Sequence, residues 1–152
     1  MAKYSTNILT GGTATALTEY SATYLATKAV DSNEDTRWAT TDTPTVPSWW
    51  KYDLGAGVAK KVMRVGTITK STEITNAFTI DGSNNDSDWT TIYTGNGADS
   101  QSWQYFNFRC TTAYRYWRIN ISSAFAGTVF SISEIQMYTD MSPNANFLFN
   151  LT

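Results

Sequence analysis

The sequence predicts an all-β protein, a β-sandwich jelly roll of about eight antiparallel strands. Short runs of alternating or β-branched residues recur about every ten residues, and clusters of Gly, Asn, Asp and Ser separate them. No segment of helical length carries the apolar period of an amphipathic helix. The length of 152 residues suits one core. We therefore expect a single sandwich over residues 1–140 and a short tail over 141–152.

The first part of the chain is expected to form two short edge strands and a loop. Asn7–Leu9 and Thr13–Leu17 carry the short apolar runs. Tyr20, Tyr24 and Leu25 follow in a loop-like stretch, where they either pack into the core or form an exposed aromatic contact. Packing is favoured, because most large aromatic side chains are substantially buried.

Seven further runs alternate or are rich in β-branched and aromatic residues, which is typical of strands. They are residues 48–54, 60–69, 77–81, 89–93, 103–108, 114–121 and 129–138. The loops between them are residues 39–47, 70–76, 82–88, 95–101 and 122–128. Alternation also assigns the faces of a strand, so Phe106 and Phe108 should lie on one face and Trp103 and Tyr105 on the other.

Composition excludes several classes of function. The chain has no histidine, which excludes Ser-His-Asp and Cys-His catalysis and histidine zinc sites. A net charge of −2 and a single lysine pair, Lys60-Lys61, argue against a nucleic-acid surface. The one cysteine, Cys110, is expected to be a buried thiol. We find neither a signal peptide at the start nor an apolar window long enough to span a membrane, so we expect a chain made in the cytoplasm or cut from a larger secreted protein.

The polar stretch that ends at Trp38 is dense in oxygen-bearing side chains. They are Asp31, Asn33, Asp35 and Thr36. Calcium takes six to eight oxygen ligands of this kind, but the same residue types also favour solvated turns without any metal. The residues of this stretch alone leave both interpretations open. A second such stretch, Gly82–Asp88, is better explained as a turn.

Five segments, in this order, carry recognisable motifs. They are residues 28–38 (compare A-x-D-G-N-x-x-T-x-W), 47–55 (P-x-W-x-x-x-D-L-G), 80–89 (G-S-N-D-G-x-x-W), 113–119 (A-R-Y-V-R-I) and 131–138 (S-I-A-E-I-x-L-Y). They resemble the discoidin, or coagulation factor five/eight type C, domain family, which includes the family 32 carbohydrate-binding modules. Each motif is weak alone, but five in the right order are strong, and the resemblance runs from about Asn7 to Tyr138. It implies a galactose-binding-like β-sandwich jelly roll.

The resemblance also implies a structural calcium ion, Ca2+, as in many members of the family. Carried over by position, the ligands would be the Lys28 carbonyl, Asp31, Asn33, Thr36, the Ser133 carbonyl and Glu134. All are hard oxygens, and two are carboxylates that balance the charge. Calcium would explain Glu134 in an otherwise apolar strand, where an unpaired buried carboxylate is costly. Ser32 stands where the family usually has glycine, and it fits less well if that position needs φ > 0.

Ligand binding in the family uses loops at one end of the sandwich. In this chain they are residues 40–48, 70–76 and 122–128. Sugar-binding members combine a histidine, a basic residue, an asparagine and an aromatic platform, and by position Lys70, Asn76 and Phe125 correspond to the last three. Asp42 or Thr43 lies near the place of the missing histidine, and Glu73 shares a loop with Lys70. Phe125 either stacks on a sugar or packs its own loop, and a solvated Lys70 is the simpler alternative.

The expected function is a non-catalytic, lectin-like module with a glycan or cell-surface polysaccharide as partner. The alternative is a structural or adhesive component of a virus or phage particle, such as a tail or capsid-surface protein. The apolar tail residues Phe147–Phe149 would then contact a neighbouring subunit of a homo-oligomer or larger assembly, or else fold back on their own sandwich. Phospholipid binding through Tyr20, Tyr24 and Leu25 is disfavoured, because the disulfide of the lipid-binding members is absent. Both leading functions imply an extracellular or virion-surface location.

Overall fold

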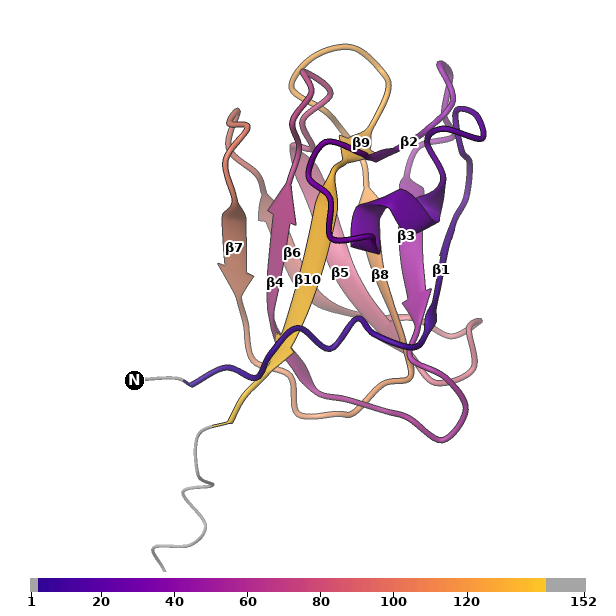
Figure 1. Ribbon diagram of the computed structural model, residues 1–152. Coiled ribbons are helices and arrows are strands. Elements are labelled where there is room, and N and C mark those ends of the chain that lie inside the picture. Colours follow the sequence, from indigo (N-terminus) through magenta and orange to yellow (C-terminus); the bar gives the residue numbers. More distant parts are fainter. Residues whose placement is uncertain (1–2, 142–152) are drawn as a thin grey trace, which may run out of the picture.

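The computed structural model describes residues 3–141, which form ten strands and one short 3-10 helix (Figure 1). In chain order they are β1 (Thr13–Ala16), η1 (Ala26–Val30), β2 (Trp38–Ala39), β3 (Ser48–Asp53), β4 (Val62–Ile68), β5 (Ala77–Ser83), β6 (Thr90–Asn96), β7 (Gln104–Asn107), β8 (Tyr116–Ile121), β9 (Ser131–Ile132) and β10 (Glu134–Thr139). Every strand pairing is antiparallel, so the all-β prediction is confirmed. The tail residues Phe147–Phe149 lie outside the described residues.

The strands form two main sheets and a small ribbon. The larger sheet has the order β1-β3-β8-β5-β6, the smaller has β10-β4-β7, and β2 pairs with β9. Figure 1 shows the smaller sheet in front of the larger one. Trp50, Trp117 and Ile119 of the larger sheet share one buried cluster with Val65 and Ile135 of the smaller sheet. The core therefore lies between two sheets, which is the arrangement of a β-sandwich.

The predicted strand at 129–138 is in fact two strands, because the chain bends at Ser133. The Ser133 N–H donates to the Ile68 carbonyl (2.8 Å), and its side-chain oxygen accepts from the Lys70 N–H (3.0 Å). These contacts come from a neighbouring strand and the loop after it, so the local pattern could not reveal the bend. The bend places Glu134 at the start of β10.

Two strands run further than their turn residues suggested. β5 continues through Gly82 and Ser83, which pair with β8 although both were expected in a loop. β6 likewise reaches Asn96. Gly82 has no room for a side chain, because a Cβ there would lie 2.4 Å from the Tyr114 ring. This glycine therefore allows an aromatic ring to pack on the strand, and it does not end the strand.

The N-terminal segment was also misjudged in part. Thr13–Ala16 is a strand as predicted, but the structure contains no strand at Asn7–Leu9. The Ile8 N–H donates to the Met137 carbonyl (2.9 Å), but the Met137 N–H donates to the Asn7 side-chain oxygen (3.0 Å). The asparagine thus replaces a backbone partner and interrupts the ladder.

Two buried tryptophans fix the polar stretch between η1 and β2. The Trp50 indole N–H donates to the Ala26 carbonyl at the start of η1 (2.9 Å). The Trp38 indole N–H donates to the Thr18 carbonyl (3.0 Å). Both rings are fully buried. The loop that carries the predicted calcium ligands is therefore anchored to the core at both ends.

Two polar groups outside the candidate site find partners within the fold. Cys110 is buried and its thiol donates to the Thr112 carbonyl, which confirms the predicted buried thiol, and burial raises the pKa of this thiol. In the Gly82–Asp88 stretch, Asp86 pairs with Lys51 at 2.7 Å, as expected for a turn held by protein contacts. No helix within residues 3–141 is long and apolar enough to cross a membrane.

Candidate functional site

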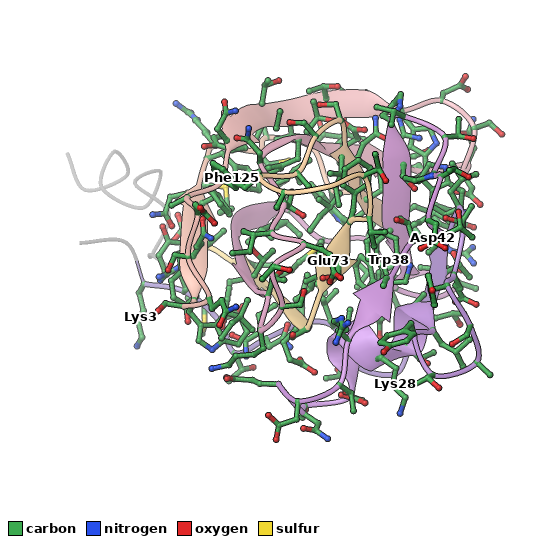
Figure 2. The ribbon with its side chains drawn as sticks, turned by 90° about the horizontal axis from the view of Figure 1, so that it is seen from above. Lys3, Lys28, Trp38, Asp42, Glu73 and Phe125 are labelled. Carbon is green, nitrogen blue, oxygen red and sulfur yellow. The ribbon has the colours of Figure 1, made fainter. Side chains whose placement is uncertain are left out.

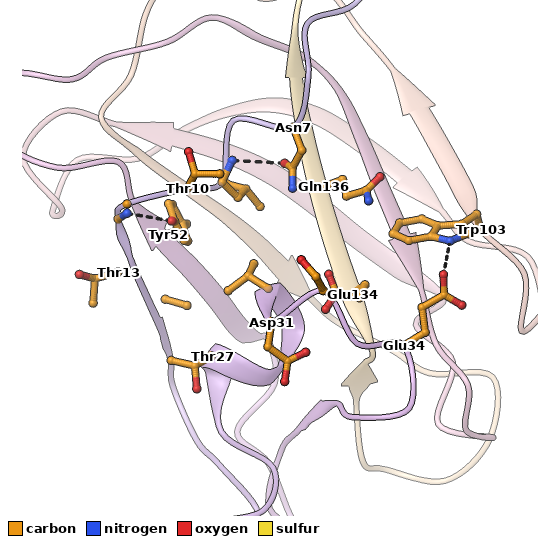
Figure 3. A pocket seen from close by; sticks show the side chains of 16 residues that line it. Asn7, Thr10, Thr13, Thr27, Asp31, Glu34, Tyr52, Trp103, Glu134 and Gln136 are labelled. Carbon is orange, nitrogen blue, oxygen red and sulfur yellow. Dashed lines mark hydrogen bonds between the residues drawn. The ribbon is translucent and has the colours of Figure 1, made fainter.

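Two carboxylates that lie far apart in the sequence meet where η1 ends and β10 begins. Asp31 follows η1 directly, and Glu134 is only 5% exposed. A single backbone N–H, that of Asn33, is within 3.1 Å of both Asp31 Oδ1 and Glu134 Oε1. Figure 3 shows both side chains between the short helix and β10. The fold thus joins the predicted loop to the predicted strand.

Further oxygens surround Asp31. The Thr36 hydroxyl oxygen lies 2.8 and 2.9 Å from the two Asp31 oxygens and 3.0 Å from the Asn33 carbonyl oxygen. The Asn33 side-chain oxygen instead accepts from the Asp35 N–H. Asn33 therefore offers its backbone carbonyl to the cluster. Four of the six predicted calcium-binding residues come together here.

The other two adjoin this group along the chain. Lys28 lies in the last turn of η1, and its ammonium is 3.4 Å from Asp31 Oδ2. Ser133 is buried and immediately precedes Glu134. Within residues 3–141, no three His, Cys, Asp or Glu side chains are grouped to hold a metal ion. A cation at this place would therefore need hydroxyl and carbonyl oxygens as well, which is the ligand mixture that calcium accepts.

The charge state of Glu134 reflects this crowding. The pKa of Glu134 is raised from its ordinary value of 4.5 to about 7, mainly because the carboxyl is buried and also because the Asp31 carboxyl lies beside it, against the lowering effect of the Asn33 N–H. A cation beside the pair would favour the ionised form of both carboxyls. The donor set therefore fits calcium in both chemistry and charge.

The residue between Asp31 and Asn33 has a left-handed backbone. Ser32 has φ = 62°, a conformation that glycine adopts without steric cost. We expect Ser32→Gly to raise the free energy of unfolding by about 1 kcal/mol, measured by urea denaturation. Ser87→Gly is the matched control in the other Asx-rich loop, since its φ is not positive, and it should be slightly destabilising. Loss of stability in Ser32→Gly would contradict this account.

A cleft of about 220 Å³ opens at the loop end of the sandwich, and we call it the terminal cleft. It is lined by Tyr20, Tyr24, Arg37, Ala39, Asp42, Glu73 and Val129. Asp42 and Glu73 are predicted ligand-binding residues from two different loops (Figure 2). Tyr20 is 48% exposed and meets Tyr24 edge to face, with 5.7 Å between ring centroids. The cleft thus combines an accessible aromatic ring with two carboxylates.

Arg37 supplies the positive charge of the terminal cleft. Its guanidinium lies over the Tyr24 ring (4.7 Å), and its Nε is 3.6 Å from Glu73 Oε2. This buried Nε has no hydrogen-bond partner within residues 3–141. Glu73 also accepts from the Ser131 hydroxyl (3.1 Å). Arg37 follows Thr36 directly, so the oxygen-rich loop sets its position.

The other three predicted ligand-binding residues do not line this cleft. The Lys70 ammonium lies 3.3 Å from Glu34 Oε2. The Asn76 side-chain oxygen accepts from the Asn96 amide (3.1 Å). Phe125 is 40% exposed, and Figure 2 shows it well apart from Asp42. The structure therefore groups only the two acidic residues of the predicted set, and a sugar contact at the remaining three stays a prediction.

Among the other residues of the terminal cleft, Arg37 was not predicted. For Tyr20 and Tyr24, packing in the core or the loop was favoured over an exposed aromatic contact, but the Tyr20 side chain is 48% exposed. The available signal was the lack of any alternation around them, in a run of small polar residues. The sequence around Arg37 carries no pattern that predicts its role, because this role depends on contacts with Tyr24 and Glu73, which belong to two other loops.

Several solved structures of similar fold are carbohydrate-binding modules. Chitosan-binding module 1 of a chitosanase/glucanase from Paenibacillus sp. IK-5 is 27% identical, with a TM-score of 0.75 over 87% of this chain and 98% of that one. The family 32 module of Clostridium perfringens NanJ, solved with galactose, is 22% identical, with a TM-score of 0.77 over 90% and 99%. The family 32 module of AlyQ, solved with 4,5-unsaturated mannuronic acid, is 24% identical, with a TM-score of 0.70 over 82% and 92%.

The sequence comparisons agree with the fold. No curated protein matches the chain. The model of the F5/8 type C domain family matches residues 13–135, which contain every strand except the last part of β10. This chain therefore belongs to the F5/8 type C domain family.

Proposed function

We propose that this protein is a non-catalytic carbohydrate-binding module that holds a glycan in the terminal cleft. The observation that carries the proposal is the exposed Tyr20 ring beside Asp42 and Glu73 in one hollow. An aromatic face stacks on the apolar face of a sugar ring, and a few well-placed polar groups fix its orientation. The likeness to carbohydrate-binding modules supports the same conclusion.

Each polar group of the cleft has a distinct part in the proposal. The carboxylates of Asp42 and Glu73 accept hydrogen bonds from sugar hydroxyl or amino groups. The Arg37 guanidinium lines the cleft and donates to a ring or hydroxyl oxygen. Stacking on Tyr24 keeps this group in place before ligand arrives.

The charges of the cleft narrow the class of glycan. Two carboxylates face one guanidinium, so the cleft carries a net negative charge. Neutral and amino-bearing sugars are therefore expected to bind better than uronic acids, which would be repelled. The similarity to a chitosan-binding module supports an amino sugar.

We further propose that a structural calcium ion joins the oxygen-rich loop to β10. Asp31 and Glu134 (Figure 3) would hold it, together with the Thr36 hydroxyl and the carbonyls of Asn33, Lys28 and Ser133. The ion would neutralise the two carboxylates. Its effect on binding would be indirect, through the position of Arg37.

A glycan array in calcium tests the proposed function. It should contain glucosamine, galactose and mannuronic acid oligomers. We expect binding to glucosamine oligomers or to neutral galactosides and none to mannuronates. In Glu73→Gln, the affinity for the sugar should fall by about tenfold, because the sugar would then donate to a neutral amide oxygen instead of a charged carboxylate.

The control is Asp88→Asn, an exposed carboxylate that does not line the cleft. It should bind as strongly as the wild type. A folded protein that binds no sugar on the array, or that prefers mannuronates, would overturn the proposal.

A further inference from the structure

A second and larger hollow lies on the side of the sandwich and shares no lining residue with the terminal cleft. Its volume is about 620 Å³, within the range of small-molecule sites. We call it the lateral groove (Figure 3). It runs between the N-terminal segment 7–14, η1 and the outer face of β10. Its principal side chains are Thr10, Thr13, Glu34, Tyr52, Trp103 and Gln136.

Trp103 forms the aromatic end of the lateral groove. Its indole N–H donates to Glu34 Oε1 (2.8 Å), and this bond is the main cause that lowers the pKa of Glu34. The ring stacks with Tyr105 at 5.8 Å between centroids and 13° between planes. Both rings lie over Gly66, where a Cβ would come within 2.7 Å of Tyr105. The position of the Trp103 ring is therefore fixed by three neighbours before any ligand binds.

Polar groups with spare hydrogen-bonding capacity face the same groove. The Gln136 side-chain oxygen accepts from the Tyr138 hydroxyl, which leaves its amide N–H groups to donate. The hydroxyl of Tyr52 accepts from the Gly12 N–H (2.9 Å) and can still donate. A rigid aromatic ring with amide and hydroxyl groups around it is the combination that recognises a sugar ring.

The side chains that line the groove are acidic. Among the described residues that line it, Asp31, Glu34 and Glu134 carry carboxylates and none is a lysine or arginine, while Lys28 and Lys70 pair with Asp31 and Glu34 from outside the lining. Uronates, sulfated sugars and phosphates would therefore be repelled. If calcium binds between Asp31 and Glu134, the Glu34 carboxylate beside Trp103 still faces the groove.

We infer that the lateral groove is a second glycan-binding site, which takes a neutral or amino-bearing oligosaccharide with one ring stacked on Trp103. Glu34 would accept, and Gln136 would donate, hydrogen bonds to that sugar. Two sites on different faces make the module bivalent toward a polysaccharide, so its avidity would exceed the affinity of either site. This second site does not depend on the terminal cleft.

Nuclear magnetic resonance of the isotope-labelled full chain in calcium tests this inference. The probes are the β-1,4-linked tetramers of glucosamine and of N-acetylglucosamine, which differ only in charge and acetylation. We expect at least one of them to shift the signals of the Trp103 indole N–H and of the Gly11 and Gly12 amides. The three shifts should saturate with the same dissociation constant. Signals of Ala39 and Val129 report the terminal cleft separately.

Variants separate the two sites. Tyr20→Ala should leave the affinity of the lateral groove for the tetramer unchanged. Trp103→Ala should lower this affinity at least tenfold, and Trp103→Phe, which keeps an aromatic ring, should retain part of it. Gln136→Ala leaves the Trp103 ring intact and should weaken binding severalfold. Unchanged amide signals outside the groove establish that each variant is folded.

No saturable shift at the groove with either tetramer would overturn the inference, even if the terminal cleft binds. A groove response that disappears in Tyr20→Ala would also overturn it. Binding at the groove without any response at Ala39 and Val129 would support the inference while contradicting the proposed function of the terminal cleft.

Discussion

Removal of calcium is expected to lower the melting temperature of the protein by about 10 °C. The folded state brings Asp31 and Glu134 together, whereas the unfolded chain has no such site. At about 1 mM calcium and a dissociation constant of about 1 µM, binding would stabilise the folded state by about 4 kcal/mol. For a domain of this size each kcal/mol shifts the midpoint by roughly 2–4 °C. Calorimetry with calcium or with chelator measures the difference.

Two variants make this test specific. Glu134→Gln keeps the shape of the side chain but removes a ligand charge, so it should abolish most of the calcium response. Asp86→Asn changes a carboxylate in the other Asx-rich loop, where Asp86 pairs with Lys51, and should keep the full response. Magnesium should replace calcium poorly, because it demands a smaller octahedral site. A wild-type protein that melts at the same temperature in chelator and in calcium would contradict the calcium proposal.

Without calcium, the free energy of unfolding is expected to fall as the pH rises from 5 to 8. Glu134 has a folded-state pKa of about 7 against an ordinary value of 4.5, so the folded state retains a proton that the unfolded state releases. The stabilisation is complete below pH 4.5 and is lost as the pH rises through 7, and it amounts to at most about 3 kcal/mol. Urea denaturation in chelator at pH 5, 6, 7 and 8 measures it.

The composition of the chain makes a change of stability between pH 5 and 8 easier to assign to Glu134. The chain has no histidine, whose ordinary pKa lies in the same range. Glu134→Gln should therefore flatten the dependence in chelator. Calcium should also flatten it in the wild type, because the ion favours the charged carboxyl. A wild-type stability that rises between pH 5 and 8 in chelator would be incompatible with a buried Glu134 beside Asp31.

The fold was largely predictable because strand alternation is a local property. Trp117, Ile119 and Ile121 are buried together, as their spacing predicts, and Phe106 and Tyr105 take opposite faces. The failures have tertiary causes. The bend at Ser133 depends on bonds to Ile68 and Lys70, and the glycine at 82 makes room for a ring that arrives from another segment.

The candidate site, like the fold, was predictable from the sequence only in part. The oxygen-rich loop is contiguous, so its oxygen donors could be read from the sequence, but the assignment to calcium and the addition of Ser133 and Glu134 required the resemblance. The terminal cleft is assembled from five separate loops and β2, and exposure decides which aromatic ring can meet a ligand. Tyr20 and Phe125 are both exposed in the structure, yet only Tyr20 lies beside the acidic residues of the cleft. Sequence alone could not rank these two rings.

Calorimetric titration of Tyr20→Ala and Phe125→Ala with one sugar from the array therefore tests the central claim most directly. Both variants remove an exposed aromatic ring at the same end of the sandwich, so each is the matched control of the other. The terminal cleft predicts at least a tenfold loss of affinity in Tyr20→Ala, with Tyr20→Phe close to the wild type and Phe125→Ala unchanged. Loss of binding in Phe125→Ala with full binding in Tyr20→Ala would contradict the claim and place the sugar on the 122–128 loop.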